Sequence, residues 1–309
     1  MIVTVTPNPS IDRTVEIDRL ERGGLIRAGV AISEAAGKGL NVSRALHGQG
    51  LDTLAVLPVA RESASIYIAL LANEVPIAAV PVHGSVRVNI SLVEPDGTVT
   101  KVNEPGPALD AADLDAMLTA VASAPPSTWI VGCGSLPPGA PADLYARLSG
   151  LGSAGRRVAI DSSGEALLAA AHAGVALIKP NLSELATIVG RPLTTLGDAV
   201  DAACDVVGQG VEALLLSLGP DGAIYVDPSG AVSHAEAAID DAVNTVGAGD
   251  ALLAGFLAKG ADSAALPEAI AWSVAAVRSP GTRMRRVTQA DREAVVAHDV
   301  VDRERRLLP

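Results

Sequence analysis

The chain reads Asn244-Thr-Val-Gly-Ala-Gly-Asp250 immediately before an apolar, Ala- and Leu-rich run from Ala251 to Ala258. The run predicts a helix. The small residues before it leave backbone N–H groups uncovered at the helix start, where these groups and the helix dipole form an anion site. Asp250 places a carboxylate inside that site. Such a carboxylate is suited to accept a proton from a hydroxyl that attacks a phosphate, although an Asp at a helix start often serves only as a cap.

The composition limits the classes of fold and partner. Of 309 residues, 49% are hydrophobic and only 2% aromatic, so the core is built from Val, Leu, Ile and Ala, which favours α/β architecture with aliphatic parallel strands. The net charge of −12 and the few aromatic residues argue against a nucleic-acid surface, which is normally basic and stacks bases on aromatic rings. No apolar run approaches the roughly 20 residues that cross a bilayer. We therefore expect a cytoplasmic protein without a membrane partner.

Short apolar strands alternate with helical stretches along most of the chain. This alternation predicts βαβ units, with helices on both faces of a mostly parallel sheet. The expected strands span residues 2–6, 53–57, 129–131, 158–160, 176–178 and 213–216, with a further hairpin at 224–226 and 231–233. The expected helices span residues 39–48, 63–73 (with Ile66, Leu70 and Leu71 on one side), 141–148, 164–171, 183–189, 196–207 and 251–258.

A second, smaller sheet is expected near the N-terminus. Residues 14–17 and 27–33 read as short strands outside the α/β core, and a hairpin is predicted for 86–92 and 99–102 around Asp96-Gly97. We interpret this sheet as a lid over the active site. The whole chain, 1–309, is then one domain with lid segments 13–33 and 86–103 inserted in the core. Because an exposed sheet has unpaired edges, we expect a homodimer through the lid.

Six further motifs precede the 244–250 stretch in a fixed order. They are Thr6-Pro-Asn-Pro-Ser-Ile-Asp12, Gly37-Lys-Gly-Leu-Asn-Val42, Arg87-Val-Asn89, Gly134-Ser-Leu-Pro-Pro-Gly139, Lys179-Pro-Asn-Leu-Ser-Glu184 and Ser217-Leu-Gly-Pro-Asp-Gly222. In combination they resemble the ribokinase-like carbohydrate kinases of the phosphofructokinase B type, most closely the 1-phosphofructokinase and tagatose-6-phosphate kinase branch. The resemblance implies a three-layer α/β/α core with a mostly parallel central sheet and a small β-sheet lid.

The resemblance also implies which residues bind the sugar phosphate. A carboxylate accepts hydroxyl hydrogen bonds, which suits a polyol, and a guanidinium grips phosphate with paired donors. Period two places Arg87 and Asn89 on one face of their strand. For Ser135 the neighbouring prolines would equally support a purely structural turn. The implied substrate-binding residues are Asp12, Gly37, Lys38, Asn41, Arg87, Asn89 and Ser135.

ATP and Mg²⁺ are the implied cofactors. The implied nucleotide-binding residues are Lys179, Asn181, Ser217, Gly219, Gly222, Thr245 and Gly249. Asn181 and Glu184 are expected to meet Mg²⁺ through water, since Mg²⁺ prefers oxygen ligands and keeps several waters; alternatively, the same two residues cap the helix that follows them. Residues 280–283 resemble the segment that closes the adenine pocket, and Arg285 and Arg286 are interpreted as a solvated face.

The reaction implied is transfer of the γ-phosphate of ATP to a hydroxyl of a phosphorylated ketohexose. Asp250 is expected to take the proton, and the N–H groups of Gly247, Ala248 and Gly249 to stabilise the phosphoryl group. The helix N-terminus is expected to keep Asp250 ionised without a raised pKa. Fructose 1-phosphate is the first choice of substrate, followed by fructose 6-phosphate and tagatose 6-phosphate. A non-catalytic, sugar-phosphate-binding regulatory protein is the alternative of another class.

Three positions depart from the pattern of these kinases. Ala36 replaces the usual first glycine before Gly37, and Ser91 stands where many relatives carry a lysine. Residues 58–64 read Pro-Val-Ala-Arg-Glu-Ser-Ala in place of a Gly-Gly-x-x-Gly stretch. Ala36 is a small change that still fits the motif, and Ser91 removes one cation that could meet the substrate phosphate. The 58–64 stretch is expected to stiffen the backbone and to affect the choice of substrate more than the type of reaction.

Overall fold

The computed structural model describes residues 1–152, 155–281 and 283–308. Within these residues a large sheet has the strand order β14-β13-β12-β11-β10-β9-β8-β1-β4-β5. Neighbouring strands from β11 to β5 in this order pair in parallel, whereas β12, β13 and β14 each pair antiparallel with the strand before them in the sequence of strands β11 to β14. The strands are β1 (Ile2–Val5), β4 (Thr53–Ala60), β5 (Ile77–Val82), β8 (Trp129–Cys133), β9 (Arg157–Asp161), β10 (Leu177–Ile178), β11 (Leu214–Ser217), β12 (Ala223–Val226), β13 (Val232–Ala237) and β14 (Val295–His298).

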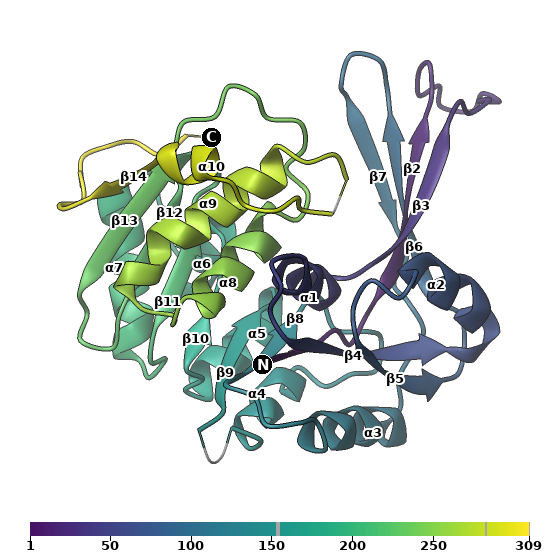
Figure 1. The fold of residues 1–309 in the computed structure, drawn as a ribbon, viewed down its shortest axis with the longest axis horizontal. Coiled ribbons are helices and arrows are strands. Elements are labelled where there is room, and N and C mark those ends of the chain that lie inside the picture. The colour runs from purple at the N-terminus through teal and green to yellow at the C-terminus, as the bar shows by residue number, and fades with distance from the viewer. Residues whose placement is uncertain (153–154, 282, 309) are drawn as a thin grey trace.

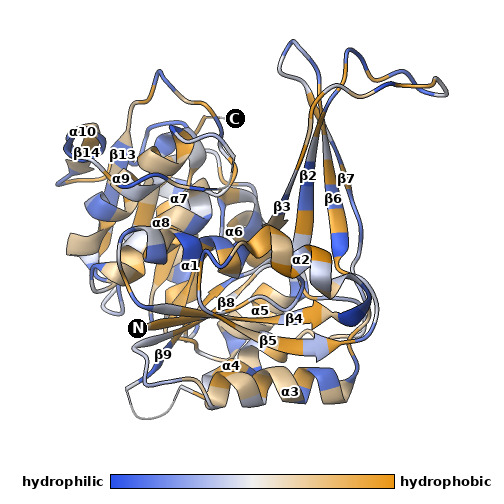
Figure 2. Cartoon of the chain, turned by 45° about the vertical axis from the view of Figure 1, so that its right-hand side comes forward, coloured by the Kyte–Doolittle hydropathy of each residue, from blue (hydrophilic) through white to orange (hydrophobic). Residues whose placement is uncertain are grey.

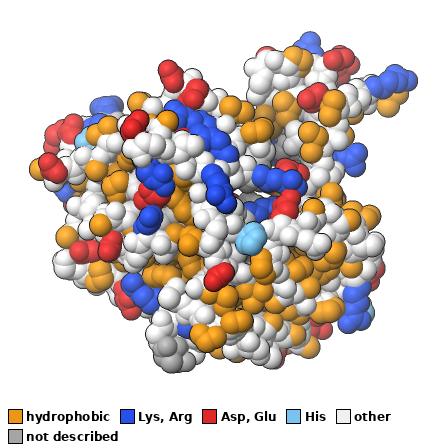
Figure 3. Space-filling view, in the orientation of Figure 1, with side chains coloured by type: hydrophobic (Ala, Val, Ile, Leu, Met, Phe, Trp, Pro, Cys, Tyr) orange, Lys and Arg blue, Asp and Glu red, His pale blue; other side chains and the backbone are white. Residues whose placement is uncertain are grey.

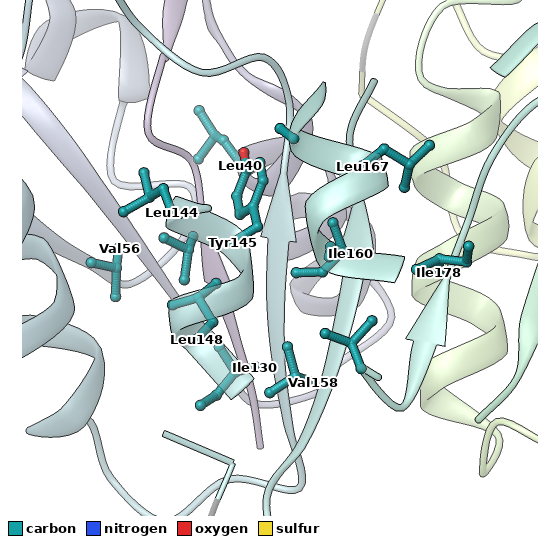
Figure 4. Packing of buried hydrophobic residues seen from close by; sticks show 14 of the residues in the cluster. Leu40, Val56, Ile130, Leu144, Tyr145, Leu148, Val158, Ile160, Leu167 and Ile178 are labelled. Atoms are coloured by element: carbon teal, nitrogen blue, oxygen red, sulfur yellow. The ribbon is translucent and has the colours of Figure 1, made fainter. Parts of the chain in front are cut away.

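Helices cover both faces of the large sheet, as the alternating pattern predicts (Figure 1). One face carries α1 (Lys38–Gly48), α8 (Ala248–Ala258) and α9 (Leu266–Val277). The other carries α3 (Ala111–Ala122), α4 (Leu144–Ser149), α5 (Gly164–His172), α6 (Leu182–Val189) and α7 (Leu196–Gly208). Figure 4 shows the second layer in contact, with Tyr145 and Leu148 of α4 packed over Ile130 and Ile160 of the sheet.

A separate four-stranded sheet projects from this body (Figure 1). Its order is β3 (Ala31–Ala36), β2 (Ser10–Glu16), β6 (Arg87–Val93) and β7 (Val99–Asn103). Figure 2 shows hydrophobic and hydrophilic residues interspersed along these strands, whereas β4 and β8 of the main sheet are mostly hydrophobic. The lid sheet is therefore solvated over much of its surface, while the main sheet is buried.

The lid strands differ in extent from the prediction. Strand β2 begins at Ser10 rather than at residue 14, because its pairing with β6 already starts at Ser10 opposite Arg87. Strand β3 covers Ala31–Ala36 rather than 27–33, since its ladder with β2 runs to Ala36. Asp12, expected in the loop after the first strand, therefore lies within the lid.

The predicted helix at 63–73 is shorter and buries a different side. It becomes α2 (Ala64–Leu71), because Ala72 adopts a left-handed conformation with φ of 50°. Tyr67 and Leu71 are buried, whereas Ile66 is 59% exposed. Elements that the sequence reading left out are β5, α3, α9, β14 and the short α10 (Gln289–Glu293). Within the described residues, none of the helices has the length and hydropathy needed to span a membrane.

Candidate active site

Helix α8 begins where the 244–250 stretch predicts an anion site. Gly247 caps the helix in a left-handed conformation, with φ of 83°, and Asp250 lies in the first turn with only 7% of its surface exposed. The N–H of Ala248 already donates to the carbonyl of Thr245, over 3.3 Å. Of the three N–H groups assigned to the phosphoryl group, those of Gly247 and Gly249 are therefore better placed to meet a ligand than that of Ala248.

Asp250 accepts a hydrogen bond from a residue of the Gly37–Val42 motif. Asn41, on α1, donates from Nδ2 to Asp250 Oδ2 over 2.9 Å. Burial raises the pKa of Asp250 to about 6, with a further contribution from the charge of Asp161, against the opposing effect of Lys38 and the Asn41 hydrogen bond. The expectation that the helix N-terminus would keep this pKa low is wrong, because desolvation of a buried carboxylate outweighs it.

Asp161 is a central residue of the site that the sequence reading missed. It ends β9, is 1% exposed, and lies between two lysines: Lys38 Nζ is 2.9 Å from Oδ1 and Lys179 Nζ is 3.1 Å from Oδ2. Burial acts to raise the pKa of Asp161, but the two ammonium groups outweigh it and hold the pKa below its ordinary value. An acidic residue directly after the apolar stretch 158–160 was the signal that could have identified it.

Both lysines therefore have a protein partner, which the motifs did not indicate. The charge of Asp161 raises the pKa of Lys38 well above its ordinary value, against the effect of burial. The Lys38 side chain is still 42% exposed, so its ammonium group can also meet a ligand. Lys179 is only 5% exposed, and an added Cβ at Gly249 would lie 3.5 Å from its Nζ. Lys179 thus lies beneath the start of α8.

The residues implied for sugar binding gather at the base of the lid. Asp12 Oδ1 accepts hydrogen bonds from Ser10 Oγ (2.8 Å) and Asn89 Nδ2 (2.9 Å), and Asp12 and Asn89 are paired across β2 and β6. Burial lowers the pKa of Arg87, partly opposed by Asp12. Figure 3 shows Lys and Arg side chains gathered at the hollow between the lid and the body.

The two loops beside the lid are in contact with each other. Asn8, which the sequence reading did not single out, donates from Nδ2 to Pro105 O (3.1 Å) and Ser135 Oγ (3.4 Å). Ser135 therefore lies near the lid base, beside the other residues implied for sugar binding. Gly37 precedes α1, and a side chain there would meet Thr6 Cγ2 at 2.7 Å, which explains why this position needs glycine.

Several polar atoms on the sugar side are buried without a protein partner. Within the described residues, Asn41 Oδ1, Arg87 Nε and Asn89 Oδ1 are among the buried side-chain atoms that form no hydrogen bond. Buried polar groups are nearly always paired, and each unpaired group costs about 1–3 kcal/mol. Unpaired atoms of this kind indicate that a polar ligand completes their hydrogen bonding.

A cavity of about 930 Å³ lies on the other side of Asp250. It is large enough for a nucleotide, since ligand pockets commonly measure about 300–1,000 Å³. Six of the seven residues expected to bind nucleotide line it, the exception being Lys179. These six are Asn181, Ser217, Gly219, Gly222, Thr245 and Gly249.

Asn181 and Glu184 form a capping box at the start of α6. Asn181 Oδ1 accepts from the Glu184 N–H over 2.8 Å, and Glu184 Oε2 accepts from the Asn181 N–H over 2.9 Å. The capping alternative is therefore confirmed. The capping box uses one carboxylate oxygen of Glu184, so the other can meet a ligand. The charge of Glu184 also contributes to the raised pKa of Lys38. A hydrated cation held partly by Glu184 fits this donor set.

The family of the chain follows from comparison with known proteins. The model of the pfkB family of carbohydrate kinases matches residues 6–282. The chain belongs to this family. A 1-phosphofructokinase of Haloferax volcanii is 38% identical over 260 residues, 84% of this chain and 83% of that protein. The ATP-dependent 6-phosphofructokinase isozyme 2 of Escherichia coli is 33% identical over 292 residues, 92% of this chain and 94% of that protein.

Solved structures of the pfkB family agree with the observed architecture. The phosphofructokinase-2 of Escherichia coli, in complex with substrates and products, has a TM-score of 0.85 at 31% identity and covers 94% of this chain and 97% of that one. The expected ribokinase-like fold is confirmed. As a member of a carbohydrate kinase family, the protein is a phosphotransferase that acts on an alcohol group.

Residues beyond the pfkB match also reach the site. Arg305, Arg306 and Leu308 line the 930 Å³ cavity, and no motif pointed to them. Arg283, at the end of the closing segment, pairs with Glu34 and Glu74; its neighbour Thr282 lies outside the described residues.

Arg285 does not belong to a solvated face, contrary to expectation. Its guanidinium forms two hydrogen bonds of 2.7 Å with the fully buried carboxylate of Asp291. Asp291 also accepts from Thr288 and Arg278, so this pair anchors the segment that leads from α9 to β14.

Proposed function

We propose that the protein transfers the γ-phosphate of ATP to fructose 1-phosphate, giving fructose 1,6-bisphosphate and ADP. The observation that carries the proposal is the position of Asp250. Its carboxylate is hydrogen bonded to Asn41 on the sugar side, while Ala248 and Gly249, directly before it, line the nucleotide-sized cavity. One buried carboxylate thus stands at the junction of the two substrates.

In the proposed mechanism Asp250 is the general base. Asn41 holds Oδ2, which leaves Oδ1 to receive the proton of the attacking hydroxyl as its oxygen bonds to the γ-phosphorus. The bond from that phosphorus to the bridging oxygen of ADP breaks at the same time. The N–H groups of Gly247 and Gly249, and in part that of Ala248, stabilise the charge on the transferring group. A pKa of about 6 keeps Asp250 ionised at neutral pH and still basic enough to take the proton.

The phosphate already on the sugar is assigned to the cations at the lid. Arg87, with its buried unpaired Nε, and the exposed part of Lys38 supply charge, and Ser135 supplies a hydroxyl. Asp12 and Asn89 then orient the sugar hydroxyls. An unphosphorylated sugar would leave Arg87 without an anion, which favours a phosphorylated substrate.

Mg²⁺ and ATP are the proposed cofactors. Glu184, with Asn181 beside it, would hold the hydrated metal, and Mg²⁺ would supply charge neutralisation at the phosphates. The six cavity residues named above would hold the nucleotide, with Lys179 supporting the start of α8 from below. Because ATP and sugar phosphates are metabolites of the cytoplasm, that compartment is the proposed location.

Fructose 6-phosphate is the main alternative substrate, since the Escherichia coli relative named above is a 6-phosphofructokinase; tagatose 6-phosphate follows. Ser91 and the 58–64 segment are the departures from the family pattern that bear on the choice of substrate. In the structure this segment lengthens β4 to Ala60 and gives Ser63, whose Oγ accepts from Val86 N–H over 2.8 Å. The departure therefore stiffens the approach to the lid.

An ATP-coupled assay over fructose 1-phosphate, fructose 6-phosphate, tagatose 6-phosphate, fructose and adenosine tests the proposal. The highest kcat/KM is expected with fructose 1-phosphate. A preference for fructose 6-phosphate would establish the alternative. Nucleotide and sugar-phosphate binding without turnover of any acceptor would instead support the non-catalytic regulatory protein.

We further propose that the lid forms a homodimer interface. Both edge strands carry exposed aliphatic side chains, Ile32 on β3 and Val99 and Val102 on β7, which are 57%, 48% and 53% exposed. Apolar residues on an unpaired sheet edge favour association with a second sheet. A second copy of the chain provides a lid with the same apolar edges.

A further inference from the structure

The C-terminal arm, residues 302–308, runs along the start of α7 toward the nucleotide cavity. Its backbone accepts from two N–H groups of that helix, Leu196 N–H to Arg305 O and Gly197 N–H to Arg303 O, both over 2.9 Å. A side chain at Gly197 would meet Arg303 O at 2.7 Å. The arm therefore has a defined path that depends on a glycine of the body.

Arg305 and Leu308 are the residues by which the arm contacts the Ser217–Gly222 loop. Arg305 forms hydrogen bonds of 2.9 and 2.6 Å with the two carboxylate oxygens of Glu236, on β13, and a third of 2.6 Å with Asp221 Oδ1. The second oxygen of Asp221 accepts from the Leu308 N–H over 2.7 Å. Asp221 is only 2% exposed, and it ends the turn Gly219–Asp221 within the Ser217–Gly222 loop. Donors from the arm thus fill both oxygens of a buried carboxylate in that loop.

The charges at this wall of the cavity require compensation. Asp221 and Glu236 both line the cavity assigned to a nucleoside triphosphate. Two uncompensated carboxylates there would repel the negatively charged phosphates of the nucleotide. Arg305 forms hydrogen bonds with both and offsets one of their two negative charges. Its hydrogen bonds are the main reason why the pKa of Glu236 falls to about 2. Arg306 adds a second cation to the lining, and Leu308 an apolar side chain.

We infer that the C-terminal arm is a structural part of the nucleotide site, with Arg305 as a positioning residue that holds the Gly219–Asp221 turn in its binding conformation. The inference rests on the proposed ATP-dependent reaction. It adds a requirement that lies after residue 282, where the pfkB match ends. Arg305 acts on the nucleotide through Asp221 and Glu236, and not on the sugar phosphate.

Arg305→Met tests this role, with Arg303→Met as the matched control. Arg303 is in the same arm, but it pairs over 2.6 Å with Asp201, which is 58% exposed, and it does not line the cavity. For Arg305→Met we expect an ATP Kd, measured by calorimetry without sugar, about tenfold above wild type, as for one buried carboxylate left unpaired. The KM for ATP should rise in parallel while the KM for the sugar phosphate stays within about twofold. Arg303→Met should match wild type.

An unchanged ATP Kd in Arg305→Met would overturn the inference, as would an equal rise in both KM values. Hydrogen exchange of the wild-type chain provides a test that does not depend on a variant folding. ADP with Mg²⁺ is expected to slow exchange at residues 302–308, and fructose 1-phosphate alone is not. Unchanged exchange in the arm on nucleotide binding would also contradict the inference. Both measurements need only bound nucleotide, so a failure of the proposed sugar specificity would leave them interpretable.

Discussion

Asn41 and Asp250 are 209 positions apart in the sequence, and the Asn41 amide donates to the Asp250 carboxylate over 2.9 Å. The bond joins α1, whose motif is assigned to the sugar, to α8, whose motif is assigned to the phosphoryl group. It fixes one carboxylate oxygen and leaves the other for proton transfer. The position and the basicity of the proposed base thus depend on a residue of the other motif.

Asp250→Asn is expected to retain ATP binding and to lose turnover. Asn has nearly the same shape but cannot take a proton, and general base catalysis contributes about 10²–10⁴-fold. The measurements are kcat in the coupled assay and the ATP Kd by calorimetry. Near-normal kcat in this variant would exclude Asp250 as the base.

The same substitution is expected to stabilise the protein at high pH. The pKa of Asp250 in the folded state, about 6, lies above the ordinary value of 3.8, so folding favours the protonated form. The contribution of Asp250 to the unfolding free energy is fully present below about pH 4 and is lost as the pH rises through about 6. Asp250→Asn should therefore exceed wild type in unfolding free energy by on the order of 1–3 kcal/mol at pH 8, and by little at pH 4. Denaturant titrations at both pH values measure this difference.

Asn41→Leu is expected to move the acidic limb of the kcat/KM profile to higher pH. In the proposed mechanism activity requires ionised Asp250, so wild-type kcat/KM should rise with pH through about 6. The Asn41 hydrogen bond favours the ionised form, and its removal should raise the pKa, shifting the limb upward by about one pH unit. A limb that stays in place would show that the titrating group is not Asp250.

Asp161→Asn is expected to destabilise the fold and to move that limb the other way. Removing the shared carboxylate leaves two lysines unpaired, one of them buried, at a cost of about 3 kcal/mol. Since the charge of Asp161 contributes to the raised pKa of Asp250, the limb should shift to lower pH. Asp201→Asn, which breaks only the exposed pair with Arg303, is the control and should change stability by less than about 1 kcal/mol.

Gly222→Ala is expected to damage the nucleotide loop more than its backbone conformation alone explains. Gly222 and Gly230 have φ of 80° and 82°, but a Cβ at Gly222 would collide with the carbonyl of Ala235, whereas Gly230 has open space. Gly230→Ala should cost about 1–2 kcal/mol for the left-handed backbone, and Gly222→Ala a further 1–3 kcal/mol, roughly, for the collision. Only Gly222→Ala should also raise the ATP Kd. Equal losses of stability in the two variants would contradict this account.

Ile32→Glu combined with Val102→Glu tests the lid interface. A charge on each exposed edge should abolish a dimer formed by these strands, and sedimentation should then show a monomer. Val300→Glu, at a side chain that is 83% exposed on the C-terminal segment, is the control and should leave the assembly unchanged. A dimer that persists in the double variant would exclude the lid edges as the interface.

Local sequence patterns were sufficient for much of the architecture. The predicted strand 129–131 lies within β8, and 213–216 is displaced by one residue from β11. Such strands are predictable because the alternation of strands and helices depends on residues close in sequence. Six of seven residues expected at the nucleotide line one cavity, since loops after neighbouring parallel strands meet at one edge of the sheet. The sequence also contains a helix-start signal for α3 that the prediction did not use, because Asp110 and Asp113 form a capping box.

The sequence by itself determined the family, the α/β class and the start of α8 at the Gly-Ala-Gly-Asp motif, where the anion site is proposed. Only the tertiary structure decided the electrostatics of the site. Asp161 gathers Lys38 from 123 positions away, and Arg305 reaches Asp221 across 84. The pKa of Asp250 depends on its burial and on charges distant in the sequence, and neither can be deduced from the residues next to Asp250. Coulomb interactions and desolvation act through space. The order of motifs in the sequence therefore indicates candidate residues, whereas the fold determines their protonation state.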